Sequence, residues 1–115
     1  METVLIPNRL IEASQNLSLM GLRLRTLALT KVSLIHYVTG IAPPISISVQ
    51  EWIYLFPESE QPYRDLTRGL ESLLSAKVQF PGQEKEIGFL ENGKYIESEG
   101  RVEFCFSGEF LKGCL

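Results

Sequence analysis

A leucine-rich stretch at residues 16–32, "NLSLMGLRLRTLALTKV", constrains the fold more than any other segment. One set of apolar residues recurs at the spacing of a single helix face. It comprises Leu17, Met20, Leu24, Leu27 and Leu34, and a second stripe comprises Leu19, Leu22 and Leu29. A helix with so few polar positions must be buried on most sides. The stretch therefore predicts a long helix through the core, ending near Gly40.

The start of this helix combines a good capping residue with an unusual first turn. Ser18 stands where an N-cap is expected, but a capping box needs Glu or Gln three residues later, and that residue is Gly21. Two explanations remain open. Either the first turn frays more easily, or Gly21 permits another backbone to approach closely.

The remaining segments alternate between helical and strand-like spacing. "NRLIEAS" (8–14) predicts a short helix, "PISISV" a half-buried strand, and "VQEWIYLF" a helix that ends at Pro57. Residues 62–76 form the clearest amphipathic helix, with Pro62 at its first position. The short strands "KVQF", "EIGFL", "KYIES" and "RVEFCFS" follow, with turns at Pro81-Gly82, Asn92-Gly93 and Glu99-Gly100, and then a last helical turn in "GEFLKGCL".

This order predicts one α+β domain over residues 1–115. Helix, long helix, strand, two helices, a β-hairpin or meander wing and a short C-terminal helical turn describe a winged helix. In that fold the second of the two tandem helices is usually presented to DNA, and here it is the helix at 62–76.

Charge and composition are those of an ordinary globular chain. The net charge of −3 comes from residues 81–115, since the first 80 residues hold equal numbers of basic and acidic side chains. Any basic patch must therefore be local and lie mostly in those first 80 residues. The sequence has no apolar run that would cross a bilayer and no signal peptide, so we expect a cytoplasmic bacterial protein with no membrane partner.

Three blocks of the sequence resemble the plasmid replication initiators of the Rep_3 type. They are "NRLIEASQNLSLMGLRLRTLALTKV", "SVQEWIYLFPESEQPYRDLTRGLESLLSAKVQF" and "KYIESEGRVEFCFSGEFLKGCL", in the family's order. The chain differs from the pattern at Gly21, where the family often has Glu, and in "FLKGCL", which lacks the usual Pro-Tyr.

The resemblance implies the first of two tandem winged-helix domains. In such initiators the first domain contributes dimerisation and DNA contacts that are largely to the backbone. Dimers repress the initiator's gene at an inverted-repeat operator, and monomers bind origin repeats called iterons. It therefore implies double-stranded DNA, a second copy of the chain and host replication proteins as partners, and a role in initiating and autoregulating plasmid replication.

The candidate DNA-binding residues lie on the exposed side of the helix at 62–76 and at its exit. They are Gln61, Arg64, Arg68, Ser72, Ser75 and Lys77. Arg64 and Arg68 are neighbours on one helix face and are suited to successive phosphates. The alternative is a solvated face on which either arginine pairs with Asp65 or Glu71.

A candidate dimer surface is the second leucine stripe, Leu19, Leu22 and Leu29, because a domain of this size struggles to bury both stripes. The alternating strands after residue 85 add an edge that a twin strand would pair with. A second hypothesis from another class is a protein-interaction module that dimerises or docks a replication partner without touching DNA.

The sequence indicates no catalytic residue, metal site, cofactor or small-molecule substrate. His36 is the only histidine and has no partner for a metal site or a Cys-His pair. We expect the arginines of the leucine stretch, Arg23 and Arg25, to snorkel at its edges. Five aromatic residues fit either a stacking platform or the core, and their apolar spacing favours the core: Trp52, Phe56, Tyr63, Phe104 and Phe106.

Overall fold

A computed structural model describes residue 10 and residues 14–115 of the chain. Its elements are β1 (Ser14–Gln15), α2 (Leu19–Leu29), α3 (Leu34–Thr39), β2 (Ile45–Ser48), α4 (Val49–Leu55), α5 (Pro62–Ser75), β3 (Lys77–Gln79), β4 (Ile87–Gly88), β5 (Leu90–Ile96), η1 (Glu97–Glu99), β6 (Arg101–Phe106) and α6 (Gly108–Gly113). The short helix expected at 8–14 falls mostly outside the described residues; within it, Leu10 is buried and Ser14 belongs to β1.

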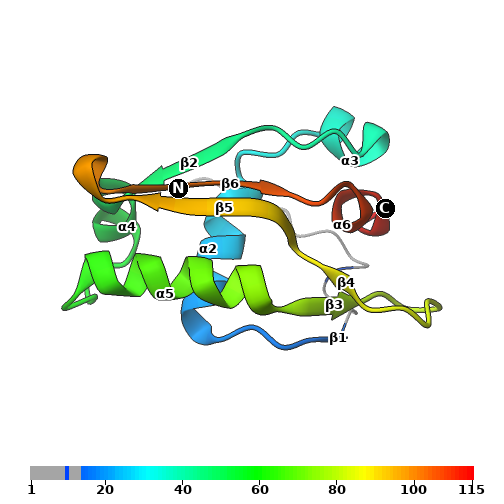
Figure 1. Cartoon of the computed structure of the whole chain (residues 1–115), viewed down its shortest axis with the longest axis horizontal. Helices are drawn as coiled ribbons and strands as arrows, with labels where there is room; N and C mark the ends of the chain where they lie inside the picture. Colours follow the sequence, from blue (N-terminus) through cyan, green and yellow to red (C-terminus); the bar gives the residue numbers. More distant parts are fainter. Residues whose placement is uncertain (1–9, 11–13) are drawn as a thin grey trace.

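Two antiparallel sheets organise the chain (Figure 1). The main sheet has the order β2-β6-β5, with Ile45 paired to Phe104 and Ile96 paired to Arg101, and the smaller sheet has the order β1-β3-β4. The helices α4 and α5 lie in the chain between β2 and β5, and η1 joins β5 to β6. This is the arrangement of a winged helix, so the predicted fold class is confirmed; α5 is the second tandem helix and η1 stands at the wing.

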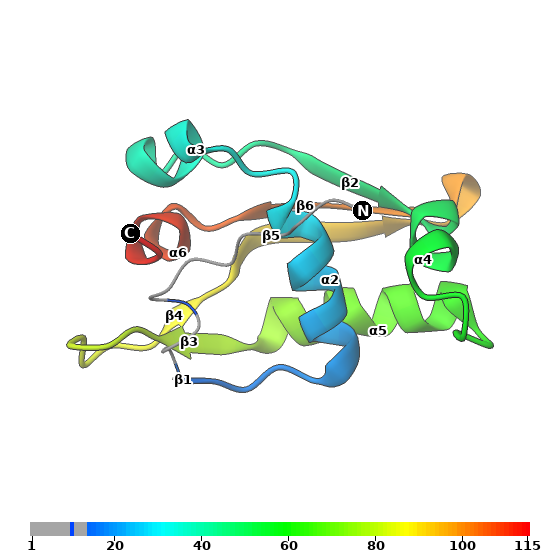
Figure 2. The same cartoon turned by 180° about the vertical axis from the view of Figure 1, so that it is seen from behind.

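The core lies between the main sheet and the helices α2 and α5, which both views show on the same side of that sheet (Figures 1 and 2). Alternation along β6 turns Val102, Phe104 and Phe106 inward, and Trp52 from α4 joins them without exposed surface. The predicted burial of Trp52, Phe104 and Phe106 is therefore confirmed. Phe56 is half-buried and packs 4.8 Å from Trp52 between ring centroids.

The single long helix expected up to Gly40 is wrong, because the chain leaves helical geometry after Leu29. The Thr30 hydroxyl bonds the Leu27 carbonyl at 2.6 Å, and Ser33 then starts α3 with a capping box that uses His36. The new start turns α3 away from the line of α2. Leu34, expected on the buried face, is 69 % exposed as a result.

The turn expected at Asn92-Gly93 is also wrong, because both residues lie within β5. The turns at Pro81-Gly82 and Glu99-Gly100 are present, and both of those glycines have positive φ. A Cβ added to Gly93 would lie 2.9 Å from Leu70 Cδ1 and 3.3 Å from Phe104 Cβ. This glycine therefore lets β5 pack closely against α5, and it does not form a turn.

Candidate nucleic-acid interface

The helix α5 is held against α2 by a contact between their backbones and small side chains. Ser18 caps α2, since its hydroxyl accepts a hydrogen bond from the Gly21 N–H at 3.1 Å, which confirms the predicted cap. The N–H of Ser18 itself donates to Ser72 Oγ at 3.1 Å. A Cβ on Gly21 would lie 2.5 Å from Ser72 Oγ, and one on Gly69 would lie 2.8 Å from the Met20 carbonyl oxygen. The group that approaches Gly21 is the Ser72 side chain rather than the backbone that was expected, and the close backbone contact between the two helices lies at Gly69.

This packing leaves one side of α5 facing solvent. Of the candidate DNA-binding residues, the exposed ones are Gln61, Arg64, Arg68, Ser75 and Lys77. We call these five the α5 face. Ser72 is not among them, because its hydroxyl is turned toward α2. The Ser75 hydroxyl donates a hydrogen bond to the carbonyl of Glu71 in the same helix, at 3.0 Å.

The arginines of the α5 face carry charge that the described chain does not neutralise. Arg64 donates to Gln61 Oε1 at 2.8 Å, and Asp65 instead accepts a hydrogen bond from Ser59 at 2.6 Å. Within the part of the chain that the structure describes, Arg64, Arg68 and Lys77 form no ion pair within 4.0 Å. The alternative in which Asp65 or Glu71 pairs with an arginine is therefore not what the structure shows.

Four other cations of the described chain are held by glutamates, whereas Lys85 and Lys112 form no ion pair within 4.0 Å among the described residues. The ion pairs are Arg23–Glu58 at 3.1 Å, Lys31–Glu51 at 3.2 Å, Lys94–Glu103 at 3.6 Å and Arg101–Glu103 at 2.7 Å. Arg101 also reaches Glu99 at 2.9 Å. The contrast with the α5 face means that an incoming anion meets unpaired arginine there without first breaking an ion pair.

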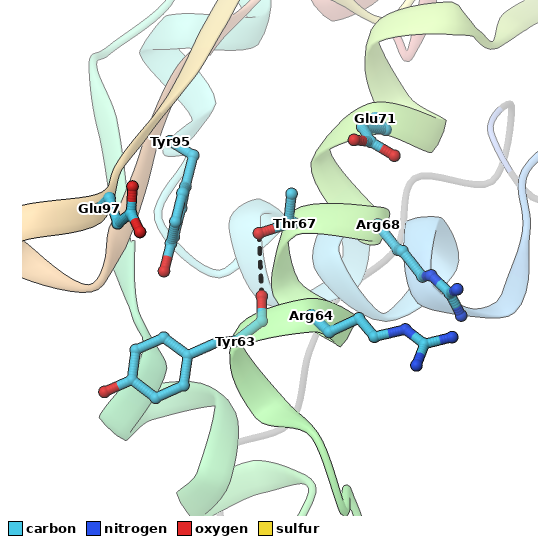
Figure 3. A pocket seen from close by; sticks show the side chains of 7 residues that line it. All are labelled: Tyr63, Arg64, Thr67, Arg68, Glu71, Tyr95 and Glu97. Atoms are coloured by element: carbon cyan, nitrogen blue, oxygen red, sulfur yellow. Dashed lines mark hydrogen bonds between the residues drawn. The ribbon is translucent and has the colours of Figure 1, made fainter.

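A groove of about 620 Å³ runs between α5 and the β5–η1 turn. Its walls are formed by Tyr63, Arg64, Thr67, Arg68, Glu71, Tyr95 and Glu97. In Figure 3, Tyr95 and Glu97 stand side by side on the strand wall, Tyr63 lies below them on the helix wall, and both arginine side chains point the other way. One side of the groove is thus aromatic and acidic, and the other side carries the two arginines together with Glu71.

Sequence reasoning missed the aromatic half of this groove. Tyr63 was expected in the core because it falls on the apolar period of α5, yet it is 55 % exposed. Its position in the first turn, at the edge of the helix–sheet contact, allows this. Tyr95 is half-buried and was not singled out, since alternation along a strand does not say which residues border a groove.

Two residues of the leucine stretch are also placed differently from expectation. Leu29 is only 4 % exposed, so it belongs to the core and is removed from the candidate dimer surface, whereas Leu19 and Leu22 are exposed. Arg25 is 5 % exposed and does not snorkel; burial lowers the pKa of its guanidinium. Arg23 does lie at an edge, with its guanidinium 4.7 Å from the Phe56 ring centroid.

Comparison with known proteins identifies the fold and the family. The family model described as "Initiator Replication protein, WH1" matches residues 3–113. The chain belongs to this family. A solved WH1 domain, that of MSBI1.176, a replication protein isolated from a multiple sclerosis patient, is 18 % identical to this one. The match covers 80 % of this chain and 74 % of that one with a TM-score of 0.61, and it supports the fold.

No curated protein matches this WH1 chain. None of the helices that the structure describes is long and apolar enough to cross a membrane. The family assignment makes this a WH1 domain of the replication initiator family, and it confirms the resemblance drawn from the three sequence blocks.

Proposed function

We propose that this chain is the DNA-binding and dimerisation domain of a plasmid replication initiator, acting in the bacterial cytoplasm on origin repeats or an operator. We also propose that it forms one winged-helix domain, the first of two in its protein, and that it works without a cofactor or a catalytic step. The observation that carries the DNA-binding half is the basic charge of Arg64, Arg68 and Lys77, which lie on the second tandem helix and at its exit and have no ion pair among the described residues.

The α5 face would act mainly on the DNA backbone. Arg64 and Arg68 are one helical turn apart, which lets each guanidinium reach a phosphate of the same strand. Lys77, the first residue of β3, adds a third cation just past the C-terminal end of α5. Only three cations per chain are involved, so the affinity should be modest, and the slope of log K against log salt should be about −2.7 for each bound chain.

A salt titration of binding to an inverted-repeat duplex tests this half. The double variant Arg64→Ala/Arg68→Ala should reduce the magnitude of the slope of log K against log salt by about 2 for each bound chain, and so by about 4 for a dimer on the inverted repeat, because each lost phosphate contact removes about 0.9. The control is Lys85→Ala/Lys94→Ala, which removes the same charge from exposed positions off the α5 face. A chain that dimerises but binds no duplex at low salt would favour the protein-interaction module.

The dimerisation half rests on an uncharged edge of the molecule. Between Lys31 and Glu51 the sequence has no acidic or basic residue except His36. Four aliphatic side chains of this segment are 56–70 % exposed: Leu34, Ile35, Val38 and Ile41. Contiguous apolar surface without charge is typical of an interface core. We call this set the α3 patch.

The same segment supplies an edge strand. The strand β2 ends the main sheet, and both views place α3 and β2 along the side of the molecule opposite α5 (Figures 1 and 2). In a two-fold symmetric dimer, each surface meets the same surface of the second copy. An exposed edge strand meets this condition by pairing antiparallel with the same strand of the second copy, and the adjacent apolar patch meets it by packing against the same patch. The proposed dimer therefore joins β2 to β2 of a second copy, with the α3 patches in contact.

The oligomeric states of two variants show whether the dimer forms through the α3 patch or through the leucine stripe of α2. Ile35→Glu/Val38→Glu should convert the dimer to a monomer in sedimentation experiments. Leu19→Glu/Leu22→Glu, which places the same charges on the exposed part of α2, should remain dimeric. The opposite pattern would assign the dimer to α2, and a monomeric wild-type chain at high concentration would remove dimerisation from the proposal.

A further inference from the structure

The groove beside α5 combines two kinds of recognition chemistry that a duplex backbone does not need. Tyr63 and Tyr95 present aromatic rings from opposite walls, and Glu97 stands beside Tyr95 (Figure 3). Phosphates would be repelled by Glu97. A groove serving only the DNA backbone has no use for a carboxylate at this point, so these three side chains need another explanation.

The polar groups of this side of the groove have no partner among the described residues. The hydroxyls of Tyr63 and Tyr95 form no hydrogen bond there, and neither does the carboxylate of Glu97. The neighbouring Glu99 differs, since Arg101 binds it at 2.9 Å. The wing turn thus holds one glutamate in an ion pair and leaves the other directed at the groove.

We infer that this groove binds an unpaired nucleotide whose base carries an exocyclic amine. The base would lie against the rings of Tyr63 and Tyr95, because stacking on aromatic side chains is how proteins hold single-stranded bases. Arg64 and Arg68 line the same groove but point away from the two tyrosines (Figure 3), so they would take phosphates further along the strand. The volume of about 620 Å³ is in the range of sites for small organic ligands.

Glu97 gives the site its base preference. A carboxylate accepts hydrogen bonds from an amine, and cytosine presents an N4 amine where thymine presents an O4 acceptor. The same carboxylate repels a thymine oxygen. The inference rests on the proposed function for the two arginines, and it adds to it a single-stranded segment with cytosine preferred over thymine.

Two matched single strands measure this preference. Oligo-dC and oligo-dT of about twelve nucleotides carry the same number of phosphates, so the electrostatic part of binding is equal for both. We expect the wild-type chain to bind oligo-dC about fivefold more tightly than oligo-dT in fluorescence anisotropy at neutral pH. Equal affinities for the two strands would overturn the inference.

Single variants of the groove assign the effect to its residues. Glu97→Gln should remove the difference between oligo-dC and oligo-dT, while Glu109→Gln, an equal charge change on α6, should leave it intact. Tyr63→Leu should lower the affinity for both oligo-dC and oligo-dT about tenfold. Its control is Tyr54→Leu, which replaces an 84 % exposed tyrosine on α4 outside the groove. If Glu97→Gln raises the affinity for both strands by the same factor, Glu97 acts only as a charge that repels phosphate, and the inference fails.

The duplex titration keeps this test separate from the proposed function. A chain that binds the inverted-repeat duplex through Arg64 and Arg68 but does not discriminate the two single strands retains the proposed function and loses this inference. A chain that discriminates the strands but does not bind the duplex retains this inference and loses the proposed duplex contact.

Discussion

At the scale of single residues, Gly21 shows how a missing capping partner is replaced from a distance. A capping box would supply a side chain at position 21 to accept the Ser18 N–H. Here Ser72 of α5 accepts that hydrogen bond at 3.1 Å, and Gly21 leaves the space in which Ser72 lies. The sequence predicted the cap correctly, because capping is local. It left the role of Gly21 open, because the partner is 54 residues away.

Substitution of Gly21 should therefore reverse the usual effect of alanine in a helix. Gly21→Ala normally stabilises a helix by about 1 kcal/mol, but here a Cβ would lie 2.8 Å from Ser72 Cβ. We expect the free energy of unfolding to fall by about 1–3 kcal/mol, and Gly21→Glu to cost at least as much. Urea denaturation checks both, and a gain in stability for either variant would mean that the first turn was merely frayed.

At the scale of elements, local signals located the helices and strands but not their junctions. The break between α2 and α3 depends on Ser33, whose capping box with His36 competes with continuation of the leucine helix. The spacing of apolar residues alone does not detect this break, because it continues without interruption to Leu34. The Asn92-Gly93 pair failed for the opposite reason: its turn signal is strong locally, but packing of β5 against Leu70 decides the outcome.

Two glycines of consecutive strands in different sheets, Gly88 in β4 and Gly93 in β5, should respond differently to alanine. Gly93→Ala should lower the free energy of unfolding by about 1–3 kcal/mol, because the new methyl group meets Leu70. Gly88→Ala, whose Cβ would have no neighbour closer than 3.9 Å, should change it by less than about 0.5 kcal/mol. Thermal denaturation of both variants checks this, and equal losses would show that strand backbone, rather than the approach of α5, sets the requirement.

The outer face of the main sheet should contribute a pH-dependent part of stability. Hydrogen bonding to Arg101, together with its charge and that of Lys94, lowers the pKa of Glu103 below its ordinary 4.5. A carboxyl with a lowered pKa stabilises the folded chain above its ordinary pKa, and this contribution is lost as pH falls through the lowered value. Wild type should thus have a higher Tm than Arg101→Gln at neutral pH, with the gap narrowing below about pH 4. A gap that is constant with pH would argue against this pair.

At the scale of the whole molecule, the order of elements was enough to predict the winged helix, but the surface was not predictable to the same extent. Amphipathic spacing identified α5 and the side bearing Arg64 and Arg68. It could not reveal the α3 patch, because Leu34 fits the spacing of the buried leucines in the sequence but is exposed in the structure. Exposure of the patch follows from the break after Leu29, which coincides with local hydrogen bonds of Thr30 and Ser33 that apolar spacing does not register.

The opposite positions of the α3 patch and the α5 face would keep the proposed dimer contact apart from the proposed DNA contact. Ile35→Glu/Val38→Glu should therefore bind a single half-site as well as wild type, and lose only the cooperative gain on an inverted repeat. Electrophoretic mobility shifts on half-site and full-site duplexes measure both quantities. Loss of half-site binding in this variant would show that the two surfaces are not independent.

The hydrogen bond from Ser18 to Ser72 also has a consequence for the order of folding. The first turn of α2 obtains its complete cap only after α5 has formed and docked, because 54 residues of chain separate the two groups. Closing a loop of that length costs entropy that local helix contacts do not repay. The leucine helix, although it comes early in the chain, is therefore completed late, once the segment proposed to meet DNA is already in place.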